Sequence, residues 1–470
     1  MSQDNTQFDK EKIEERNIGG EEEEVENSEK DSDTETLVFD RGYCWVICLA
    51  CFLINFGTWG MNSGFAIYFS VYLNNDTFPG ASKIDYAAIG GLAFGTTLIF
   101  TPLINYLQGV VGPRATIVIG NCFQFTSLML ASWSRHLWQL YLTQGLMQSA
   151  GLALISLPAM TILPQFFKKR RVLAGGLATA GSGAGGVVFN LGMQKIVEVK
   201  DVFWALRAQS IISFGLIWIA IILFRNRSEH HKIEFTFFDR EVVSSIGFYL
   251  ALIYVITCMF GYVVCLYTLA NFTTSLGYSE YQASIASAMI QVGSCFGRPL
   301  IGLLADKYGA TTLAFEAYAL SAVFVLAMWI PARNYATVMV LAFILGGIMG
   351  TIWGTFAPLL ARLVGIRKMN VSFSMLWAFL GVAGLVSPVI GVSLVKDIVG
   401  PTQYEYCALF AGVSFAVCAL SLFLLRGFVL ARDVKLDSGN TDHDLQESIA
   451  VNVSVGQMLK HSLRFRNVKV

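Results

Sequence analysis

The strongest constraint on this chain is a series of twelve long apolar segments separated by short polar ones. Crossing the roughly 30 Å hydrocarbon core of a bilayer takes roughly 20 residues of helix. Helices are favoured over strands because a backbone exposed to lipid must satisfy its own hydrogen bonds. The predicted spans are residues 44–70, 86–107, 114–134, 137–164, 172–194, 203–224, 243–269, 281–303, 310–330, 335–359, 371–395 and 404–425. The chain is therefore predicted to be an all-α membrane protein.

The charged residues are few and unevenly distributed. They make up 14% of the chain, against 54% apolar residues, whereas a soluble domain carries about 25% charged residues. Residues 1–40 hold 15 acidic and 4 basic residues, which predicts a disordered acidic tail. Within it, "SEKDSDTE" makes Ser28 and Ser32 candidate phosphorylation sites, although solvated disorder alone explains the composition. The basic C-terminal end, "KHSLRFRNVKV", predicts contact with anionic membrane lipid.

The loops between the spans indicate the orientation of the chain in the membrane. If the N-terminus is cytoplasmic, the inner loops hold 13 Lys and Arg residues and the outer loops hold 6. Because cytoplasmic loops carry an excess of Lys and Arg, both termini are predicted to be cytoplasmic. The glycosylation sequon that begins at Asn75 then lies in a short outer loop.

The stretch "QFFKKRRVLAGGLATAGSGAGGVVFN", residues 165–190, allows three interpretations: a phosphate-binding loop, a nucleic-acid patch or a membrane helix. The run from Gly181 to Gly186 fits G-x-G-x-x-G, but a dinucleotide site needs a preceding strand and a later acidic residue in a βαβ unit. Instead, Gly176, Ala180 and Ala184 recur at a spacing that lets membrane helices approach closely. We therefore predict a membrane helix that binds no nucleotide or nucleic acid. Four cations anchor its inner end: Lys168, Lys169, Arg170 and Arg171.

The two halves of the chain resemble each other, with corresponding motifs about 200 residues apart, and each half contains six predicted spans. Such an internal repeat is typical of transporter folds. The loop "YLQGVVGPRAT" at 106–116 parallels "LLADKYGATTL" at 303–313. The predicted division has five parts. They are the tail 1–40, a first bundle 41–225, a cytoplasmic linker 226–242, a second bundle 243–426 and a tail 427–470.

Several motifs resemble those of a known family. "GRPLIGLLADKYG" at 297–309 resembles the loop signature of the major facilitator superfamily. "FFKKRRVLAGGLATAGSGAGG" at 166–186 and "DRGYCW" at 40–45 look like marks of its monocarboxylate porter family. The long acidic N-terminal tail and the phrases "LRGFVLARD" and "IMGTIWGT" look most like the yeast and fungal homologues of that family. The resemblance covers about residues 40–430. It implies the major facilitator fold, twelve helices in two pseudo-symmetric bundles, and a gating role for Asp306 and Lys307.

The sequence also departs from this family in places that matter for coupling. Proton-coupled animal members carry a Lys where Ser63 stands here, and an Asp where Ser294 stands. They share the Arg at position 298. The first-half loop has Gly109 opposite Asp306, so it lacks the acidic residue of the signature. Simple proton-coupled lactate symport is therefore not expected.

Arg298 is the main candidate for substrate binding. A charge inside the membrane costs roughly 2.5–3.5 kcal/mol on insertion scales, so it requires a reason. A guanidinium grips an anion or carbonyl group with two donors. The structural alternative is a partner for inner-face carbonyls or for Glu316 on the next helix.

Neutral polar and aromatic residues complete the candidate site. The first span carries a polar stripe of Asn55, Thr58, Trp59, Asn62 and Ser63, which either faces the substrate or bonds neighbouring helices. Gln148, Gln291 and Ser294 are deeper candidates. Four aromatic residues can stack on a flat ligand, although such residues more often serve packing. They are Tyr262, Tyr267, Trp353 and Trp377.

The sequence predicts a secondary transporter for a small organic solute, with an anion and a coupling proton as candidate cargo. No enzyme, metal or cofactor constellation is visible, because all five His residues lie in loops or tails. The alternative is a non-transporting membrane sensor of nutrients that signals through its tails. From the resemblance, the plasma membrane is the first choice and the vacuolar membrane the second.

Overall fold

The computed structural model of this chain describes residues 41–75, 77–167, 170–224, 239–396, 400, 402–437 and 453–462. The predicted N-terminal tail with Ser28 and Ser32, the cations Lys168 and Lys169, Asp76 of the sequon and most of the linker 226–242 lie outside these residues. The described residues form helices joined by short turns.

The first six predicted spans coincide with helical segments. Three of them are continuous helices, and the others are assembled from consecutive pieces. In chain order they are α2 (Cys44–Asn55), η1 (Phe56–Gly60), α3 (Met61–Ser63) and α4 (Phe65–Asn74); α5 (Lys83–Ile99) and α6 (Thr101–Val111); α7 (Pro113–Ala131); α8 (Leu137–Leu140), η2 (Tyr141–Met147) and α9 (Gln148–Phe166); α10 (Arg171–Val199); and α11 (Val202–Leu223).

The last six predicted spans also coincide with helices. They are α13 (Ile246–Ser275); α14 (Glu280–Tyr308); α15 (Ala310–Phe324) and η3 (Val325–Trp329); α16 (Tyr335–Ile348), η4 (Met349–Thr351) and α17 (Ile352–Val364); α18 (Ile366–Ser393); and α19 (Glu405–Asp437). The short α12 (Arg240–Val243) precedes α13, and α20 (Val455–Ser462) follows α19.

Most of these segments meet the physical requirements of a membrane span. Within the described residues, 10 helices are long and apolar enough to cross a membrane, and 11 if the bent pair α5–α6 counts as one span. The other predicted span is α7, whose 19 residues include Arg114, Asn121 and Gln124. The bend of 52° between α5 and α6 has a local cause. Pro102 has no amide hydrogen to donate to the carbonyl four residues earlier, and its ring crowds that carbonyl.

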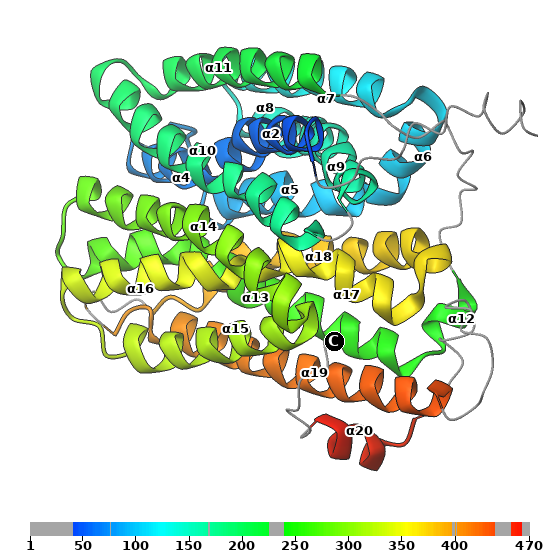
Figure 1. Ribbon diagram of the computed structural model, residues 1–470. Helices are drawn as coiled ribbons and strands as arrows, with labels where there is room; N and C mark the ends of the chain where they lie inside the picture. The colour runs from blue at the N-terminus through cyan, green and yellow to red at the C-terminus, as the bar shows by residue number, and fades with distance from the viewer. Residues whose placement is uncertain are drawn as a thin grey trace, which may run out of the picture.

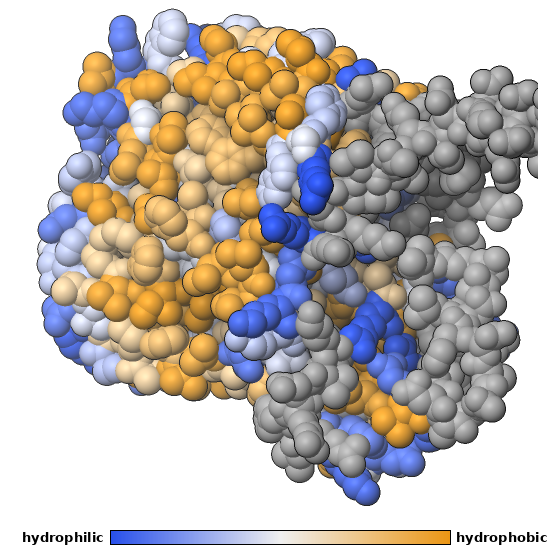
Figure 2. Space-filling model, in the orientation of Figure 1, coloured by the Kyte–Doolittle hydropathy of each residue, from blue (hydrophilic) through white to orange (hydrophobic). Residues whose placement is uncertain are grey.

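The two halves of the chain form two bundles that lie one above the other in Figure 1. The first half, blue to green, makes the upper layer, and the second half makes the lower layer. The bundles meet chiefly where α10 packs against α14 and where α5 packs against α18. In the repeat, these are the fifth span against the eighth and the second against the eleventh. The surface carries a broad apolar belt between polar ends (Figure 2), as expected for a chain surrounded by lipid.

The two ends of the bundles are distinguished by their contacts. We call the end that holds α12 and α20 the tail end; there Tyr43, at the start of the first span, donates to the carbonyl of Leu223 at 2.9 Å. The opposite end is called the loop end. There Tyr141 donates to the Asp85 carboxylate at 3.0 Å. The tail end is the one that the loop charges predict to be cytoplasmic.

Glycines allow the helices to approach closely at the bundle interface. A Cβ added to Gly176 on α10 would lie 2.5 Å from the carbonyl oxygen of Arg298, and one added to Gly95 on α5 would lie 2.5 Å from that of Gly381. Other glycines of α10 face its own bundle, since a Cβ on Gly181 would lie 2.1 Å from the carbonyl oxygen of Phe52. The glycine run is thus a membrane helix that packs on two sides, as predicted.

Candidate functional site

A central pocket lies between the two bundles, halfway along the first span. It contains about 620 Å³ of space not occupied by atoms. Both bundles contribute side chains, which come from the first, second, fourth and fifth spans and from the seventh, eighth and tenth. The lining residues are Asn55, Trp59, Asn62, Ser63, Phe94, Met160, Thr179, Ser182, Tyr262, Leu266, Tyr267, Gln291, Arg298 and Trp353.

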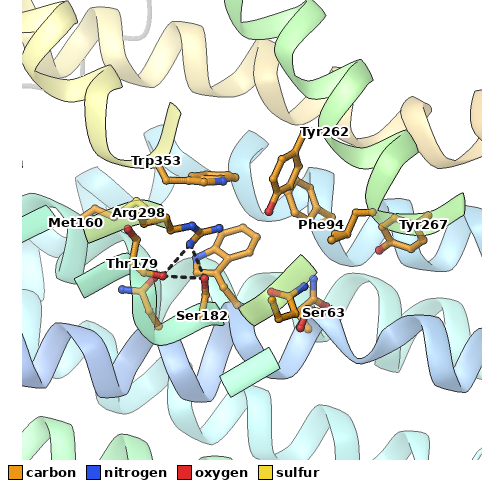
Figure 3. Close-up of a pocket in the computed structure, with 14 residues that line it drawn as sticks. Ser63, Phe94, Met160, Thr179, Ser182, Tyr262, Tyr267, Arg298 and Trp353 are labelled. Atoms are coloured by element: carbon orange, nitrogen blue, oxygen red, sulfur yellow. Dashed lines mark hydrogen bonds between the residues drawn. The ribbon is translucent and has the colours of Figure 1, made fainter. Parts of the chain in front are cut away.

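Arg298 projects from α14 into this pocket and reaches the opposite bundle. Its Nη1 donates to the carbonyl oxygen of Thr179 at 2.8 Å and to the hydroxyl of Ser182, both on α10. Figure 3 shows these two bonds, with Trp353 and Tyr262 nearby. The side chain is 7% exposed, and its Nε has no hydrogen-bond partner. Arg298 therefore bonds across the bundle interface rather than with Glu316, and it keeps an unused donor.

Aromatic rings close one side of the pocket. The rings of Trp59, in the first bundle, and Trp353, in the second, have centroids 5.5 Å apart. Phe94 lies against both, at 5.2 Å from Trp59 and 6.4 Å from Trp353. Neither indole N–H has a hydrogen-bond partner. A buried donor without a partner costs about 1–3 kcal/mol, so these groups favour a ligand that brings acceptors.

Four residues of the polar stripe of the first span line the pocket, and one of them, Asn62, also accepts a hydrogen bond from Gln148 of the fourth span. Asn55 donates to its own helix at the carbonyl of Cys51, at 2.8 Å, and Ser63 donates to Gly60 at 2.6 Å. Both still line the pocket. The span is interrupted here by the π-helical turn η1, which carries Trp59. Such turns inside α-helices often occur at functional sites because they change the direction of a side chain.

A larger vestibule continues from the central pocket to the tail end. It contains about 1430 Å³ of unoccupied space, and four of its residues also line the central pocket. They are Asn55, Met160, Thr179 and Trp353. Farther out, the vestibule is lined by Gln165 and Arg171, close to the tail end of the first bundle. The described structure therefore gives the central pocket a wide opening toward one end.

The charge of these two cavities is positive. Among the described residues that line them, the charged side chains are Arg298 and Arg171, and none is Asp, Glu or His. A fixed cation surrounded by neutral polar groups and N–H donors favours an anion or a carbonyl group.

The predicted substrate-binding residues divide into two groups. Nine line the central pocket: Asn55, Trp59, Asn62, Ser63, Tyr262, Tyr267, Gln291, Arg298 and Trp353. Four do not. Thr58 is buried and donates to the Ile54 carbonyl of its own helix at 2.6 Å. Gln148 is buried behind Asn62 and donates to it at 3.4 Å, Ser294 is buried on α14, and Trp377 lines the vestibule one layer nearer the tail end.

Sequence reasoning did not identify several lining residues. These are Phe94, Met160, Thr179, Ser182 and Leu266. Apolar and small hydroxyl side chains in membrane helices carry no charge or motif that marks them. A weak signal existed for Ser182, because it interrupts a run of Gly and Ala with the only hydroxyl between residues 180 and 190.

Of the predicted gating and topology residues, the four that the structure describes lie at the tail end. Asp306, at the end of α14, accepts hydrogen bonds from the backbone N–H groups of Val172 and Leu173 at 3.2 and 3.0 Å. These belong to the first turn of α10, so a carboxylate of one bundle caps a helix of the other. Arg171 donates to the carbonyl of Phe167, Arg170 is exposed, and Lys307 lies 5.1 Å from the Tyr308 ring.

Comparison with known proteins adds a second line of information. Residues 47–270 and 250–461 match the model of the Major Facilitator Superfamily. The chain is 43% identical over 434 residues to the Saccharomyces cerevisiae protein named "Probable transporter MCH2", covering 91% of this chain and 92% of that protein. It is 31% identical to the "Uncharacterized transporter ESBP6" of the same yeast, over 87% of this chain and 62% of that protein. The "MFS-type transporter opdF" of Penicillium oxalicum is 29% identical, over 81% of this chain and 90% of that protein.

Proposed function

This chain belongs to the major facilitator superfamily, and we propose that it carries a small organic anion across the membrane. Its relatives are named as transporters, so the chain is a multi-pass membrane transporter of a small solute and not an enzyme. The sensor alternative finds no support among these names. What remains to be proposed is the class of solute, the binding residues and the coupling.

The observation that supports an anion is the environment of Arg298. Among the described residues that line the central pocket it is the one that carries a charge, and its Nη1 donates to two neutral acceptors, the Thr179 carbonyl and the Ser182 hydroxyl. A carboxylate can accept two parallel hydrogen bonds from a guanidinium and adds the attraction of opposite charges, which a neutral carbonyl or hydroxyl lacks. A carboxylate or similar anion therefore competes well for the guanidinium. The N–H groups of Trp59 and Trp353 supply further donors.

Binding of this kind also provides a link to alternating access. Arg298 belongs to the second bundle, whereas its two acceptors belong to the first. An anion that takes over the guanidinium replaces a bond between bundles with bonds to itself. The bundles, residues 41–225 and 243–426, then move relative to each other around the site. Gln291, Asn62 and Ser63 complete the proposed binding surface, while Gln148 and Ser294 support it from behind.

The proposed family is the monocarboxylate porters, but without simple lactate–proton symport. Ser63 faces the pocket where proton-coupled animal members carry a Lys, and Ser294 replaces their Asp. No described residue lining the two cavities is an acid or a His. A coupling proton therefore has no carrier there. We propose cytoplasmic tails and, by resemblance, the plasma membrane before the vacuolar membrane.

The test compares metabolites in cells that overproduce the wild type or the Arg298→Lys variant at equal membrane abundance. We expect one or more organic anions whose distribution changes with the wild type and changes at least about tenfold less with the variant, since losing one charge-assisted bond costs about 1.5–3 kcal/mol. In proteoliposomes, a pH gradient should drive no lactate flux. Transport of a neutral or cationic solute that survives Arg298→Lys would overturn the proposal.

A further inference from the structure

A separate chamber lies between the bundles nearer the loop end. It contains about 540 Å³ of unoccupied space and is lined by the first, fifth, seventh and eighth spans. It shares no lining residue with the central pocket. Its polar side chains include Ser70, Asn190, Gln194, Asn271, Ser284 and Ser287, with Glu280 at the exposed rim.

The chamber continues the path of the central pocket on the same helix faces. On α10, Thr179 and Ser182 line the pocket, and Asn190 and Gln194 line the chamber, at helical spacing. The eighth span repeats the pattern, with Gln291 in the pocket and Ser287 in the chamber. The two cavities are therefore arranged in series along one route.

A narrow layer separates the two cavities. A Cβ added to Gly186 of α10 would lie 2.7 Å from both the Gln291 Cγ and the Ser63 Oγ. Beside this contact the rings of Phe65 and Tyr267 have centroids 6.4 Å apart. A solute that leaves the central pocket toward the loop end must pass this layer and then enters the chamber.

Asn190 is the feature that indicates a ligand. It is 1% exposed, it lines the chamber, and neither its Oδ1 nor its Nδ2 has a hydrogen-bond partner in the described structure. Asn121, Gln124 and Gln148 each leave one amide atom unpaired but still donate through the other; Gln148, for example, donates to Asn62. Leaving a buried amide unpaired costs about 1–3 kcal/mol for each group. The Asn190 side chain therefore requires a partner that offers both a donor and an acceptor.

The chemistry of the chamber differs from that of the central pocket. Its buried polar groups are amides and hydroxyls, without a Lys or Arg among the described lining residues. A hydroxyl group donates and accepts through one oxygen, so adjacent hydroxyls pair with both atoms of an amide. We propose that the chamber is a second solute subsite that binds the hydroxyl groups of a small polyhydroxylated solute, with Asn190 as its main ligand. This inference rests on the proposed transport function.

The test uses the full-length protein purified in detergent, with Cys122, the one exposed cysteine, changed to Ala. Ser284→Cys reports on the chamber through its rate of reaction with a small methanethiosulfonate reagent. Erythritol, at about twice its dissociation constant, should slow this reaction about threefold, whereas sodium acetate should not. Asn190→Leu should abolish the protection without changing the unprotected rate.

The matched control is Asn121→Leu, a buried amide on α7 that does not line the chamber; it should keep the protection. A reporter that erythritol never protects would show a chamber filled by water alone and would overturn the inference, as would protection that survives Asn190→Leu. The result is independent of the anion proposal, because Arg298→Lys is expected to leave erythritol protection intact.

Discussion

Arg298 is tolerated within the membrane because the first bundle gives its guanidinium two hydrogen-bond partners. It is 7% exposed, yet it reaches a carbonyl and a hydroxyl of α10, and Gly350 leaves room for the guanidinium. A Cβ on Gly350 would lie 3.0 Å from the Arg298 Nε. The same geometry leaves one donor unused. This combination, a stable cation with spare bonding capacity, is what a binding residue requires.

Single lining residues were predictable where a charged, polar or large aromatic side chain lies in an apolar span. Arg298 was identified from the sequence because a charge inside the membrane costs free energy. Trp59 and Trp353 were identified because their aromatic side chains are large. Thr179 was not, because its contribution is a backbone carbonyl, which every residue possesses. Gln148 was predicted as a ligand, but the sequence does not tell whether a buried amide faces a cavity or another side chain, and here it faces Asn62.

Two adjacent glycines offer a test of the close approach between the bundles. Gly176→Ala places a Cβ 2.5 Å from the carbonyl oxygen of Arg298, so α10 and α14 must separate. Such overpacking costs about 1–3 kcal/mol, and we expect a lower thermal denaturation midpoint and a loss of transport. Gly175→Ala meets nothing within 4 Å and should behave as the wild type. Equal behaviour of the two variants would argue against a tight interface at this position.

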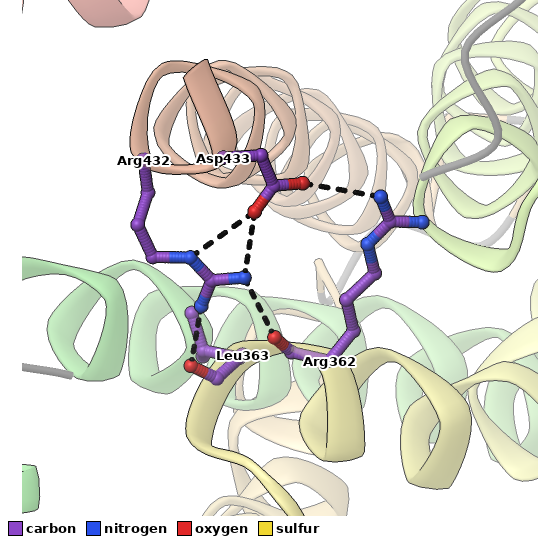
Figure 4. A network of polar contacts seen from close by, with 4 residues as sticks. All are labelled: Arg362, Leu363, Arg432 and Asp433. Atoms are coloured by element: carbon purple, nitrogen blue, oxygen red, sulfur yellow. Dashed lines mark hydrogen bonds and ion pairs between the residues drawn. The ribbon is translucent and has the colours of Figure 1, made fainter. Parts of the chain in front are cut away.

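At the scale of elements, the tail end of α17 is held by α19. Arg432, on α19, donates to the last carbonyls of α17, those of Leu363 and Arg362, at 2.8 and 2.9 Å. Its neighbour Asp433 accepts from Arg432 at 3.0 Å and from the Arg362 side chain at 3.1 Å (Figure 4). These bonds satisfy helix-end carbonyls that would otherwise lack partners. The helix that carries Trp353 is thereby fixed at one end.

Replacing Arg432 with Leu should therefore destabilise the second bundle. The variant removes the donor to the carbonyls of Leu363 and Arg362 and one of the two partners of the Asp433 carboxylate, which keeps its bond to the Arg362 side chain. We expect the free energy of unfolding to fall by about 2 kcal/mol. Thermal denaturation in detergent measures the effect. The control is Arg333→Leu, because Arg333 also donates to two carbonyls but is exposed at the loop end. If both variants lose the same stability, the bonds from Arg432 to the end of α17 have no special role in holding the second bundle.

The helices could be predicted from the sequence more reliably than their irregular turns and their ends. All twelve spans follow from run length, because lipid leaves a backbone no alternative to helix. The π-helical turn η1 was not predicted, since no single residue in "FGTWG" requires it. The end of α19 was also misplaced: the helix continues past residue 425 to Asp437. It does so because Arg426 and Arg432 are buried by bonds to neighbouring segments rather than facing water.

At the scale of the whole molecule, the two halves are equivalent in packing but not in charge. The α10–α14 contact corresponds to the α5–α18 contact under the repeat, and glycines line both. Only the former has a carboxylate at the helix end, because Asp306 caps α10 while its counterpart is Gly109. The first turn of α18 instead carries Lys368, which pairs with Glu241 and, at 3.7 Å, with Asp239. We therefore expect the α10–α14 and α5–α18 contacts to respond differently when a charged side chain at the helix end is removed.

The wide vestibule that the described residues form gives the molecule a direction that can be measured. The vestibule opens at the tail end, which the loop charges predict to be cytoplasmic. Gly354→Cys places a thiol in the vestibule, where a Cβ meets nothing within 4 Å, and Thr274→Cys places one in the chamber near the loop end. In intact cells that carry Cys122→Ala, a membrane-impermeant maleimide should label Thr274→Cys but not Gly354→Cys. Permeabilisation should make both reactive. The reverse pattern would place the tails outside the cell and would invert the predicted topology.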